Sequence, residues 1–227
     1  MKKVIVISGG TSGLGKAIAE SLSNDYRVII LSPNKKKLVK TVEQIKCDFE
    51  VCDVADEESI KLAVKNVISK HRRIDCLINN AGIWVEGELT ENKVERIKEV
   101  TATNALGAIL LTKEIVPQMK KQGRGLIIIV NSQAGLYGKA DRSVYTASKW
   151  ALTGFTKSLQ FELPKYGIRV TGLYPGKMKT NLFSKVGINK DMADALQPKE
   201  VAKVIQFILS LKDNVILPEV GVKHIDN

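Results

Sequence analysis

The sequence predicts an α/β fold in which a parallel sheet is covered by helices on both faces. Segments that are almost wholly apolar and rich in β-branched residues alternate with segments whose apolar residues recur at helical spacing. Strands of this composition are buried on both sides, as is typical of parallel sheets. The chain has 227 residues, is 44% hydrophobic and contains no linker, so we expect one domain spanning residues 1–227.

The elements can be placed in order along the chain. We expect strands at residues 3–8, 27–32, 49–54, 74–82, 125–132 and 168–176. We expect helices at residues 16–23, 36–45, 57–71 and 93–119, and in the stretch that carries Tyr145. Glycines and polar residues cluster where the first, fourth, fifth and sixth strands end. Ligands of such sheets bind beyond the carboxyl ends of the strands, so these residues point to a single site.

Composition argues against several classes of function. No apolar run is long enough to span a membrane, and the short run after Lys2 and Lys3 stops in glycines, which fits the first strand of a cytoplasmic protein better than a signal peptide. Cys47, Cys52 and Cys76 lack the spacing of a zinc site or a disulfide framework, so we expect no metal. The net charge of +11 comes from scattered lysines without interleaved aromatic residues, so we expect no specific nucleic-acid partner.

The stretch "SGGTSGLG" at residues 8–15 follows the first strand and opens the first helix. Gly9, Gly13 and Gly15 allow a sharp turn and a close approach of the backbone to a ligand. The helix that follows offers free N–H groups and a positive partial charge to a pyrophosphate. The position between a strand and a helix makes a dinucleotide-binding turn the favoured interpretation.

The stretch "NNAG" at residues 79–82 closes the fourth strand. Its two asparagines can satisfy backbone groups, and Ala81 and Gly82 leave room for a flat ligand. On its own, an ordinary loop explains this stretch equally well.

Tyr145 and Lys149 stand one helical turn apart in "YTASK". A phenol with a pKa near 10 is a poor proton donor or acceptor at neutral pH, and a neighbouring ammonium lowers that pKa. Tyr145 would then act as an acid toward a carbonyl or as a base toward an alcohol. Ser132, at the end of the fifth strand, can donate to the same substrate oxygen. Asn104 interrupts an otherwise apolar helix, which also favours a functional role.

Together these motifs, with "PGKMKT" at residues 175–180, resemble the classical short-chain dehydrogenase/reductase family over the whole chain. The resemblance implies a Rossmann-type, doubly wound sheet and hydride transfer between a nicotinamide ring and a carbonyl or secondary alcohol. Tyr145 would be the acid/base, Lys149 would bind the nicotinamide ribose, Ser132 would orient the carbonyl, and Asn104 would hold a water in a relay to Lys149. The catalytic set it implies is Asn104, Ser132, Tyr145 and Lys149.

The resemblance also implies a set of cofactor contacts. The glycine turn would wrap the pyrophosphate, Asp53 would bind the adenine, and Thr180 would contact the carboxamide. The full set is Gly9, Thr11, Ser12, Gly13, Leu14, Gly15, Ser32, Asp53, Val54, Asn80, Ala81, Gly82, Tyr145, Lys149, Pro175, Gly176, Met178 and Thr180.

Two positions depart from the family pattern, and a third bears on the choice of cofactor. Ser8 stands where threonine is usual, and Asn131 replaces the serine before Ser132. Ser32 occupies the end of the second strand, where a carboxylate would bind the ribose hydroxyls of NAD and repel the 2′-phosphate of NADP. Three lysines follow shortly at residues 35–37. We therefore favour NADP(H) over NAD(H).

Residues 177–197 correspond to the substrate lid of the family. They combine Met178, Leu182, Phe183 and Met192 with lysines that could meet an anionic group, and Trp84 and Tyr137 are further candidates for the border of the site. The tail at residues 198–223 is similar to the branch that acts on 3-hydroxy acids and small carbonyls.

The resemblance therefore favours a small ketone or a 3-hydroxy or 3-oxo acid as the substrate. A 3-oxoacyl-acyl-carrier-protein reductase is the alternative, and a non-catalytic dinucleotide sensor is the alternative of another class. The resemblance also implies a homodimer or homotetramer formed through helix 93–119 and the helix after Tyr145.

Overall fold

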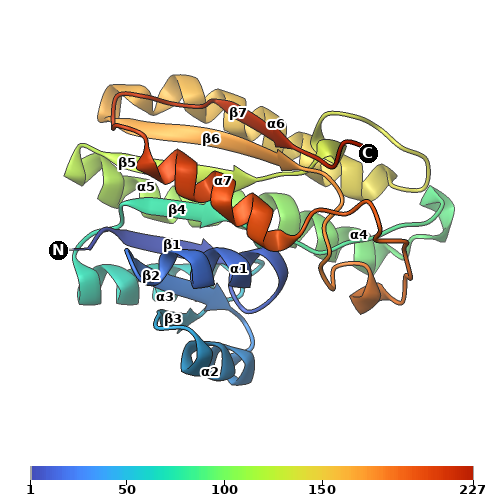
Figure 1. Ribbon diagram of the computed structural model, residues 1–227, viewed down its shortest axis with the longest axis horizontal. Coiled ribbons are helices and arrows are strands. Elements are labelled where there is room, and N and C mark those ends of the chain that lie inside the picture. Colours follow the sequence, from blue (N-terminus) through green and yellow to red (C-terminus); the bar gives the residue numbers. More distant parts are fainter. Residues whose placement is uncertain (1, 227) are drawn as a thin grey trace.

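A parallel sheet forms the centre of the computed structural model, which describes residues 2–226 (Figure 1). Within these residues the sheet has seven strands in the order β3-β2-β1-β4-β5-β6-β7, and every neighbouring pair is parallel. The strands are β1 Val4–Ser8, β2 Arg27–Ser32, β3 Asp48–Val51, β4 Cys76–Asn79, β5 Gly125–Val130, β6 Ile168–Pro175 and β7 Glu219–Val222. The predicted α/β fold with a doubly wound parallel sheet is confirmed.

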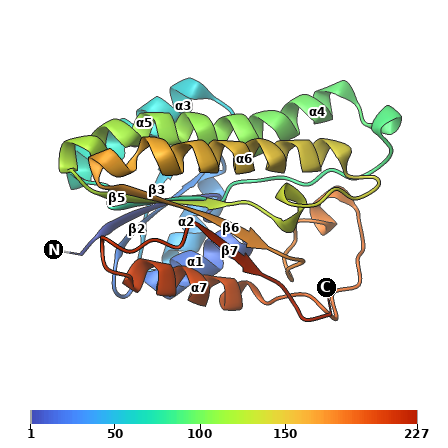
Figure 2. The ribbon, with the colours of Figure 1, turned by 90° about the horizontal axis from the view of Figure 1, so that it is seen from above.

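Helices cover both faces of this sheet, as Figure 2 shows with the sheet seen along its edge. Successive strand residues point to opposite faces, so Ile127 of β5 belongs to one core and Ile128 to the other. The first core includes side chains of α3, α5 and α6, and the second includes side chains of α1, α2 and α7. The helices are α1 Gly13–Leu22, α2 Lys35–Gln44, α3 Glu57–His71, α4 Val94–Thr101, α5 Gly107–Gln122, α6 Ser143–Glu162 and α7 Pro198–Ser210.

The direction of strand order reverses between β1 and β4, and this reversal positions the site. From β1 the chain builds outward to β2 and β3 on one side, then crosses over to β4, β5, β6 and β7 on the other. The connections that follow β1 and β4 therefore diverge to opposite sides and leave a crevice at the carboxyl ends. In Figure 1 these ends point to the right, toward the orange segment at residues 177–197.

The structure corrects several predicted boundaries. Strands β3 and β4 end at Val51 and Asn79, earlier than expected, so Asp53 and Ala81 lie in loops beyond the strand ends. The predicted helix 93–119 consists of α4, a π-helical turn at Ala102–Leu106, and α5. Strand β7 and helix α7 were absent from the predicted elements. β7 is only four residues long and mixes exposed with half-buried positions, so it lacks the apolar run that marks the inner strands.

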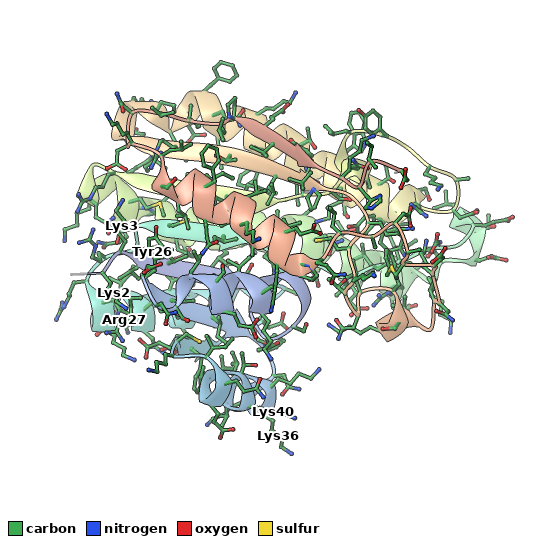
Figure 3. All side chains as sticks on the ribbon, viewed as in Figure 1. Lys2, Lys3, Tyr26, Arg27, Lys36 and Lys40 are labelled. Atoms are coloured by element: carbon green, nitrogen blue, oxygen red, sulfur yellow. The ribbon has the colours of Figure 1, made fainter. Side chains whose placement is uncertain are left out.

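The distribution of charge matches the scattered lysines of the sequence. The labelled Lys2, Lys3 and Arg27 lie near the amino ends of the strands, whereas Lys36 and Lys40 point outward from α2 (Figure 3). None of the helices in residues 2–226 is long and apolar enough to cross a membrane. In the same residues, His, Cys, Asp and Glu side chains form no group of three that could hold a metal ion.

Gly15 is required by the packing of α1 on the glycine turn. A Cβ built at Gly15 would lie 2.3 Å from the carbonyl oxygen of Gly9 and 2.6 Å from Nδ2 of Asn80, both closer than real contacts allow. Gly9 itself has a φ of +70°, a conformation that favours glycine. Glycine is therefore favoured at position 9 by the backbone conformation and required at position 15 by the close packing of α1 against the turn.

We expect Gly15→Ala to lower the free energy of unfolding by about 1–3 kcal/mol, the usual cost of overpacking. Urea unfolding followed by tryptophan fluorescence measures this change. Gly138→Ala is the matched control, because a Cβ there meets nothing within 4 Å. The control should shift stability by no more than ~0.5 kcal/mol. Equal stability of the two variants would contradict the packing role of Gly15.

Candidate active site

A cavity of about 460 Å³ opens at the carboxyl ends of β1 and β4. Its walls come from the glycine turn, the ends of β2, β4 and β5, helix α6, and the segment at residues 177–197. The sequence-predicted residues that line it are Gly9, Thr11, Ser12, Gly13, Leu14, Ser32, Asp53, Val54, Asn80, Ala81, Gly82, Tyr145, Lys149, Met178 and Thr180. Residues from distant parts of the chain thus converge on one crevice.

The turn after β1 is fastened to the end of β4 by a set of hydrogen bonds. The hydroxyl of Ser8 accepts from the backbone N–H groups of Asn80 and Ala81, both at 3.0 Å. In return, the side-chain amide of Asn80 donates to the carbonyls of Ser8 at 2.9 Å and Gly9 at 3.3 Å. The departure from threonine at position 8 keeps the hydroxyl that this junction uses.

The other asparagine of "NNAG" faces the helical layer. Asn79 is buried and donates from Nδ2 to the hydroxyl of Thr112 in α5 at 2.8 Å. Asn80 therefore shapes the cavity, while Asn79 ties β4 to a covering helix.

Tyr145, Ser132 and Lys149 meet at the inner end of the cavity. Tyr145 is 5% exposed and Lys149 is 4% exposed, and both lie on α6. The ammonium of Lys149 donates to the carbonyl of Val130 at 3.3 Å and lies 5.8 Å from the centre of the Tyr145 ring. Ser132 begins a short turn after β5, and its side chain is near enough to the Tyr145 phenol to lower the pKa of that phenol. A phenol, a hydroxyl and an ammonium therefore share a largely buried site at the cavity.

Burial dominates the proton affinities of these groups in the cofactor-free protein. It raises the pKa of Tyr145 to about 12, against the opposing effects of the Ser132 hydrogen bond and the Arg142 charge. It also lowers the pKa of Lys149 to about 8. The expectation that Lys149 lowers the tyrosine pKa therefore does not describe this state. The charge that opposes burial at Tyr145 comes from Arg142, which stands three residues earlier.

Asn104 lies in the π-helical turn between α4 and α5 and is fully buried. Its Oδ1 accepts from the N–H of Ile83 at 2.8 Å, and its Nδ2 donates to the Ile83 carbonyl at 3.0 Å and to the Ser148 hydroxyl at 3.1 Å. A Cβ at Gly82 would lie 3.4 Å from Asn104 Oδ1 and 3.9 Å from Lys149 Nζ. The side chain of Asn104 thus ties the loop after β4 to α6, beside the buried lysine.

An aromatic group covers the tyrosine on the outer side. Trp84 packs on Tyr145 with 4.3 Å between ring centroids, and Phe183 meets Trp84 edge-on at 4.8 Å. Arg142 and Lys190 each lie 5.2 Å from the centre of the Trp84 ring. Phe183 and Lys190 belong to the 177–197 segment, so this segment packs against Trp84 and, through Trp84, lies beside Tyr145.

Glu86 holds the two cations beside Trp84. Its Oε1 accepts from Lys190 at 2.8 Å and from Arg142 at 3.2 Å, and Trp84 donates to its Oε2 at 3.3 Å. Burial opposes the charge on this carboxylate, but the hydrogen bonds and charges of Lys190 and Arg142 hold its pKa below the ordinary value. Two cations share one anion here, which leaves a net positive charge next to Tyr145.

Comparison with known proteins agrees with this architecture. The family model described as short chain dehydrogenase matches residues 3–191. An uncharacterized oxidoreductase of Thermotoga maritima is 37% identical over 217 residues, which cover 92% of this chain and 83% of the relative. The 3-oxoacyl-acyl-carrier-protein reductase of the same organism is 35% identical over an alignment of 233 positions that covers 96% of this chain and 94% of the relative.

A solved structure adds a fold comparison. A metagenomic short-chain oxidoreductase in complex with NADP is 31% identical and superposes with a TM-score of 0.84, covering 97% of this chain and 96% of that one. This chain belongs to the short-chain dehydrogenase/reductase family. The predicted family is therefore confirmed, and the protein is an oxidoreductase of that family.

The cavity of this dehydrogenase/reductase fits the nicotinamide dinucleotide that the family implies. Gly9 and Gly13 have φ values of +70° and +53°, which favour glycine. Because glycine has no side chain, the backbone at these two positions stays open to a ligand. The Ser12 hydroxyl does not cap α1, and the first turn of α1 has no acidic residue. The N-terminus of α1 therefore keeps its attraction for a phosphate group.

Several predicted residues do not line the cavity. Gly15 packs under the turn, and Pro175 and Gly176 lie where β6 pairs with β7. Ser132 and Asn104 reach the site through Tyr145 and Gly82.

Sequence reasoning also left residues out of the site. It named Trp84 as a border residue, and Trp84 packs on Tyr145. Neither Trp84 nor Tyr137 lines the cavity, and Tyr137 is 69% exposed. It missed Glu86 and Arg142, and it did not single out Lys37 and Lys185, which line the cavity. The three lysines at residues 35–37 gave a partial signal for Lys37, and the lysines of residues 177–197 gave one for Lys185, whereas nothing local marks Glu86 and Arg142.

The ionisation of the buried Tyr145 phenol can be followed by ultraviolet absorbance. In the cofactor-free protein, the absorbance difference near 295 nm between wild type and Tyr145→Phe should show no phenolate up to about pH 10, because burial places the Tyr145 pKa at about 12. Below that pKa the neutral phenol is the stable form. A titration step in the difference spectrum near neutral pH would contradict this ionisation state.

Proposed function

We propose that the protein is an NADP(H)-dependent oxidoreductase that interconverts a carbonyl and a secondary alcohol, with Tyr145 as the acid/base. The observation that carries this proposal is the meeting of a buried phenol, the Ser132 hydroxyl and the buried Lys149 ammonium beside a cavity with a glycine turn. A bound cofactor would supply or accept the hydride, and the chain would supply position and a proton. The enzyme class would be an alcohol dehydrogenase or carbonyl reductase of the short-chain type.

Each residue of the catalytic set has its own role in this reaction. Tyr145 protonates the carbonyl oxygen during reduction and accepts the alcohol proton during oxidation. Ser132 holds the same oxygen by a hydrogen bond, which orients it toward the phenol. Lys149, close to the Tyr145 ring, binds the cofactor ribose and offers a positive charge to a developing phenolate. Asn104 fixes the loop after β4 against α6, and through it the placement of Gly82 and Lys149.

The preference for NADP rests on the end of β2. Ser32 is a hydroxyl where a carboxylate would repel a 2′-phosphate, and Lys37 lines the cavity just beyond it. The solved structure of the metagenomic relative contains NADP. The remaining cofactor contacts are proposed for the cavity-lining residues named above.

The substrate is proposed to be a small ketone or a 3-oxo or 3-hydroxy acid. Trp84 packs on Tyr145 and Phe183 packs on Trp84, and bulky rings beside the phenol favour a small substrate. Arg142 and Lys190 share a single carboxylate, so their excess positive charge favours an anionic substrate group near Tyr145. Residues 177–197 act as the lid over this substrate pocket. A cytoplasmic location stays a prediction from the sequence.

A 3-oxoacyl-acyl-carrier-protein reductase is the second candidate. Its support is the Thermotoga relative of that name, at 35% identity over nearly the whole chain. The net charge of +11 would also suit an acidic carrier protein. A non-catalytic dinucleotide sensor is the candidate from another class. Turnover that depends on Tyr145 would distinguish an enzyme from such a sensor.

The proposal predicts that Tyr145→Phe binds NADPH with the wild-type Kd but loses turnover by about 10²-fold or more, the range of general acid catalysis. Fluorescence titration measures binding, and loss of the reduced-nicotinamide absorbance measures turnover. The substrate panel contains a short 3-oxo acid, its neutral methyl ester and an acetoacetyl thioester.

Faster turnover of the free acid than of its ester supports anionic recognition, and turnover of the thioester alone selects the second candidate. Binding of NADPH without turnover of any compound favours the sensor. Wild-type turnover by Tyr145→Phe would exclude the assigned acid/base.

We also propose a homodimer or homotetramer in which α6 meets a second copy of the chain. Trp150 and Phe161 of α6 are 51% and 90% exposed, and they share one helix face with Gly154. A Cβ at Gly154 would meet nothing within 4 Å, so this face offers open space for a partner helix. Helix α5 lies beside α6 on the same side of the sheet (Figure 2).

Phe161→Glu should convert the oligomer to smaller species, because a charge in an apolar helix interface is costly to bury. Light scattering after size-exclusion chromatography measures the mass. Leu62→Glu on α3 is the control, since Leu62 is 60% exposed and lies on another helix. An unchanged mass for Phe161→Glu would place the interface elsewhere.

A further inference from the structure

A lysine of the 177–197 segment reaches the glycine turn. Lys185 lies in the short helical turn at Ser184–Val186, and its ammonium is 3.4 Å from the Ser12 hydroxyl. Ser12 immediately precedes α1, and its hydroxyl is not used to cap that helix. Both residues line the cavity. The segment that closes the substrate mouth at Phe183 therefore also extends over the cofactor end of the crevice.

A second lysine faces the same end of the cavity. Lys37 stands in the first turn of α2, whose N-cap Asn34 accepts from the Lys37 backbone N–H at 2.9 Å. Burial lowers the pKa of Lys185, and the positive charge of Lys37 lowers it further. The two ammonium groups therefore lie close enough to repel each other, although they come from segments far apart in the sequence.

No carboxylate in residues 2–226 forms an ion pair with Lys37 or Lys185. The acidic residues that line the cavity, Asp53 and Glu99, have other partners: Asp53 accepts from the N–H of Ala55 at 2.9 Å, and Glu99 pairs with Arg96. The polar groups in contact with the two lysines are neutral: the Ser12 hydroxyl lies beside Lys185, and the Asn34 side chain accepts from the backbone of Lys37. Two unpaired cations beside neutral hydrogen-bonding groups form a binding site for a doubly charged anion.

We propose that Lys185 and Lys37 clamp the 2′-phosphate of NADP, so that the 177–197 segment contributes directly to cofactor specificity. The position of Ser32 at the end of β2 assigns this end of the cavity to the adenosine ribose, which carries that phosphate. The phosphate would relieve the repulsion between the two ammonium groups. This inference rests on the proposed use of a nicotinamide dinucleotide. It adds Lys185, which comes from the 177–197 segment and not from the end of β2, to the residues that would select NADP.

Binding of cofactor fragments tests the clamp without any turnover. Isothermal titration compares 2′,5′-ADP, which carries the 2′-phosphate, with ADP, which carries the pyrophosphate, and compares NADP⁺ with NAD⁺. We expect Lys185→Gln to weaken 2′,5′-ADP and NADP⁺ by about tenfold and to leave ADP and NAD⁺ within about twofold. Lys37→Gln should show the same selectivity.

Matched controls carry the same loss of charge. Lys179→Gln lies in the same segment and Lys36→Gln in the same helix, but neither of these lysines lines the cavity. Lys36 points outward from α2 in Figure 3. Both controls should leave every Kd within about twofold.

Other outcomes would overturn the clamp. Equal weakening of ADP and 2′,5′-ADP binding by Lys185→Gln would indicate that Lys185 binds the pyrophosphate. Unchanged affinities would show that Lys185 does not bind the cofactor. If wild type binds none of the four nucleotides, the proposed cofactor itself fails, which is a separate result.

A second readout concerns the segment itself. Chymotrypsin can cut after Leu182 and Phe183 only when the segment opens. In wild type, 2′,5′-ADP should slow this cleavage and ADP should not, whereas in Lys185→Gln neither should slow it. Equal protection of both proteins by 2′,5′-ADP would contradict the link between the phosphate and the segment.

Discussion

The junction between the glycine turn and the end of β4 is the constraint on which the site depends. One hydroxyl, that of Ser8, accepts two backbone N–H groups, and one amide, that of Asn80, donates to two backbone carbonyls. This exchange satisfies the polar groups of two parallel strands at the place where their ladder stops. Gly15 lets α1 press against the same turn. The cavity exists because these two strand ends are locked together while their connections diverge.

Burial of charge is the second constraint, and it opposes stability. The ammonium of Lys149 is nearly inaccessible to water and has one weak backbone partner. Because its pKa falls to about 8 in the folded protein while the unfolded chain keeps the ordinary value, the unfolded state binds more protons above pH 8, and folding stability rises with pH through that interval. Below pH 8 the full cost of the buried charge is present. Such a destabilised group is typical of a functional site.

The parts of the structure that the sequence predicted are those encoded locally. Apolar runs marked the inner strands, and the glycine spacing marked the turn, because each pattern arises from neighbouring residues. The π-helical turn around Asn104 was not visible, since it depends on a register change within a continuous helical pattern. Glu86 carried no local signal either, and Lys185 was only one of several lysines in its segment. Their partners lie 56, 104 and 173 positions away in the sequence, so only the fold brings them together.

The 177–197 segment connects the two ends of the cavity, and this gives the proposed clamp a consequence for the order of events. Toward the substrate, Phe183 packs on Trp84 and Lys190 binds Glu86. Toward the cofactor, Lys185 reaches Ser12 only two residues beyond Phe183 in the chain. A short segment cannot move one of these groups far without moving the other. A phosphate held by Lys185 would therefore also fix Phe183 against Trp84, the residue that packs on Tyr145, so binding of NADP would prepare the substrate pocket before the substrate arrives.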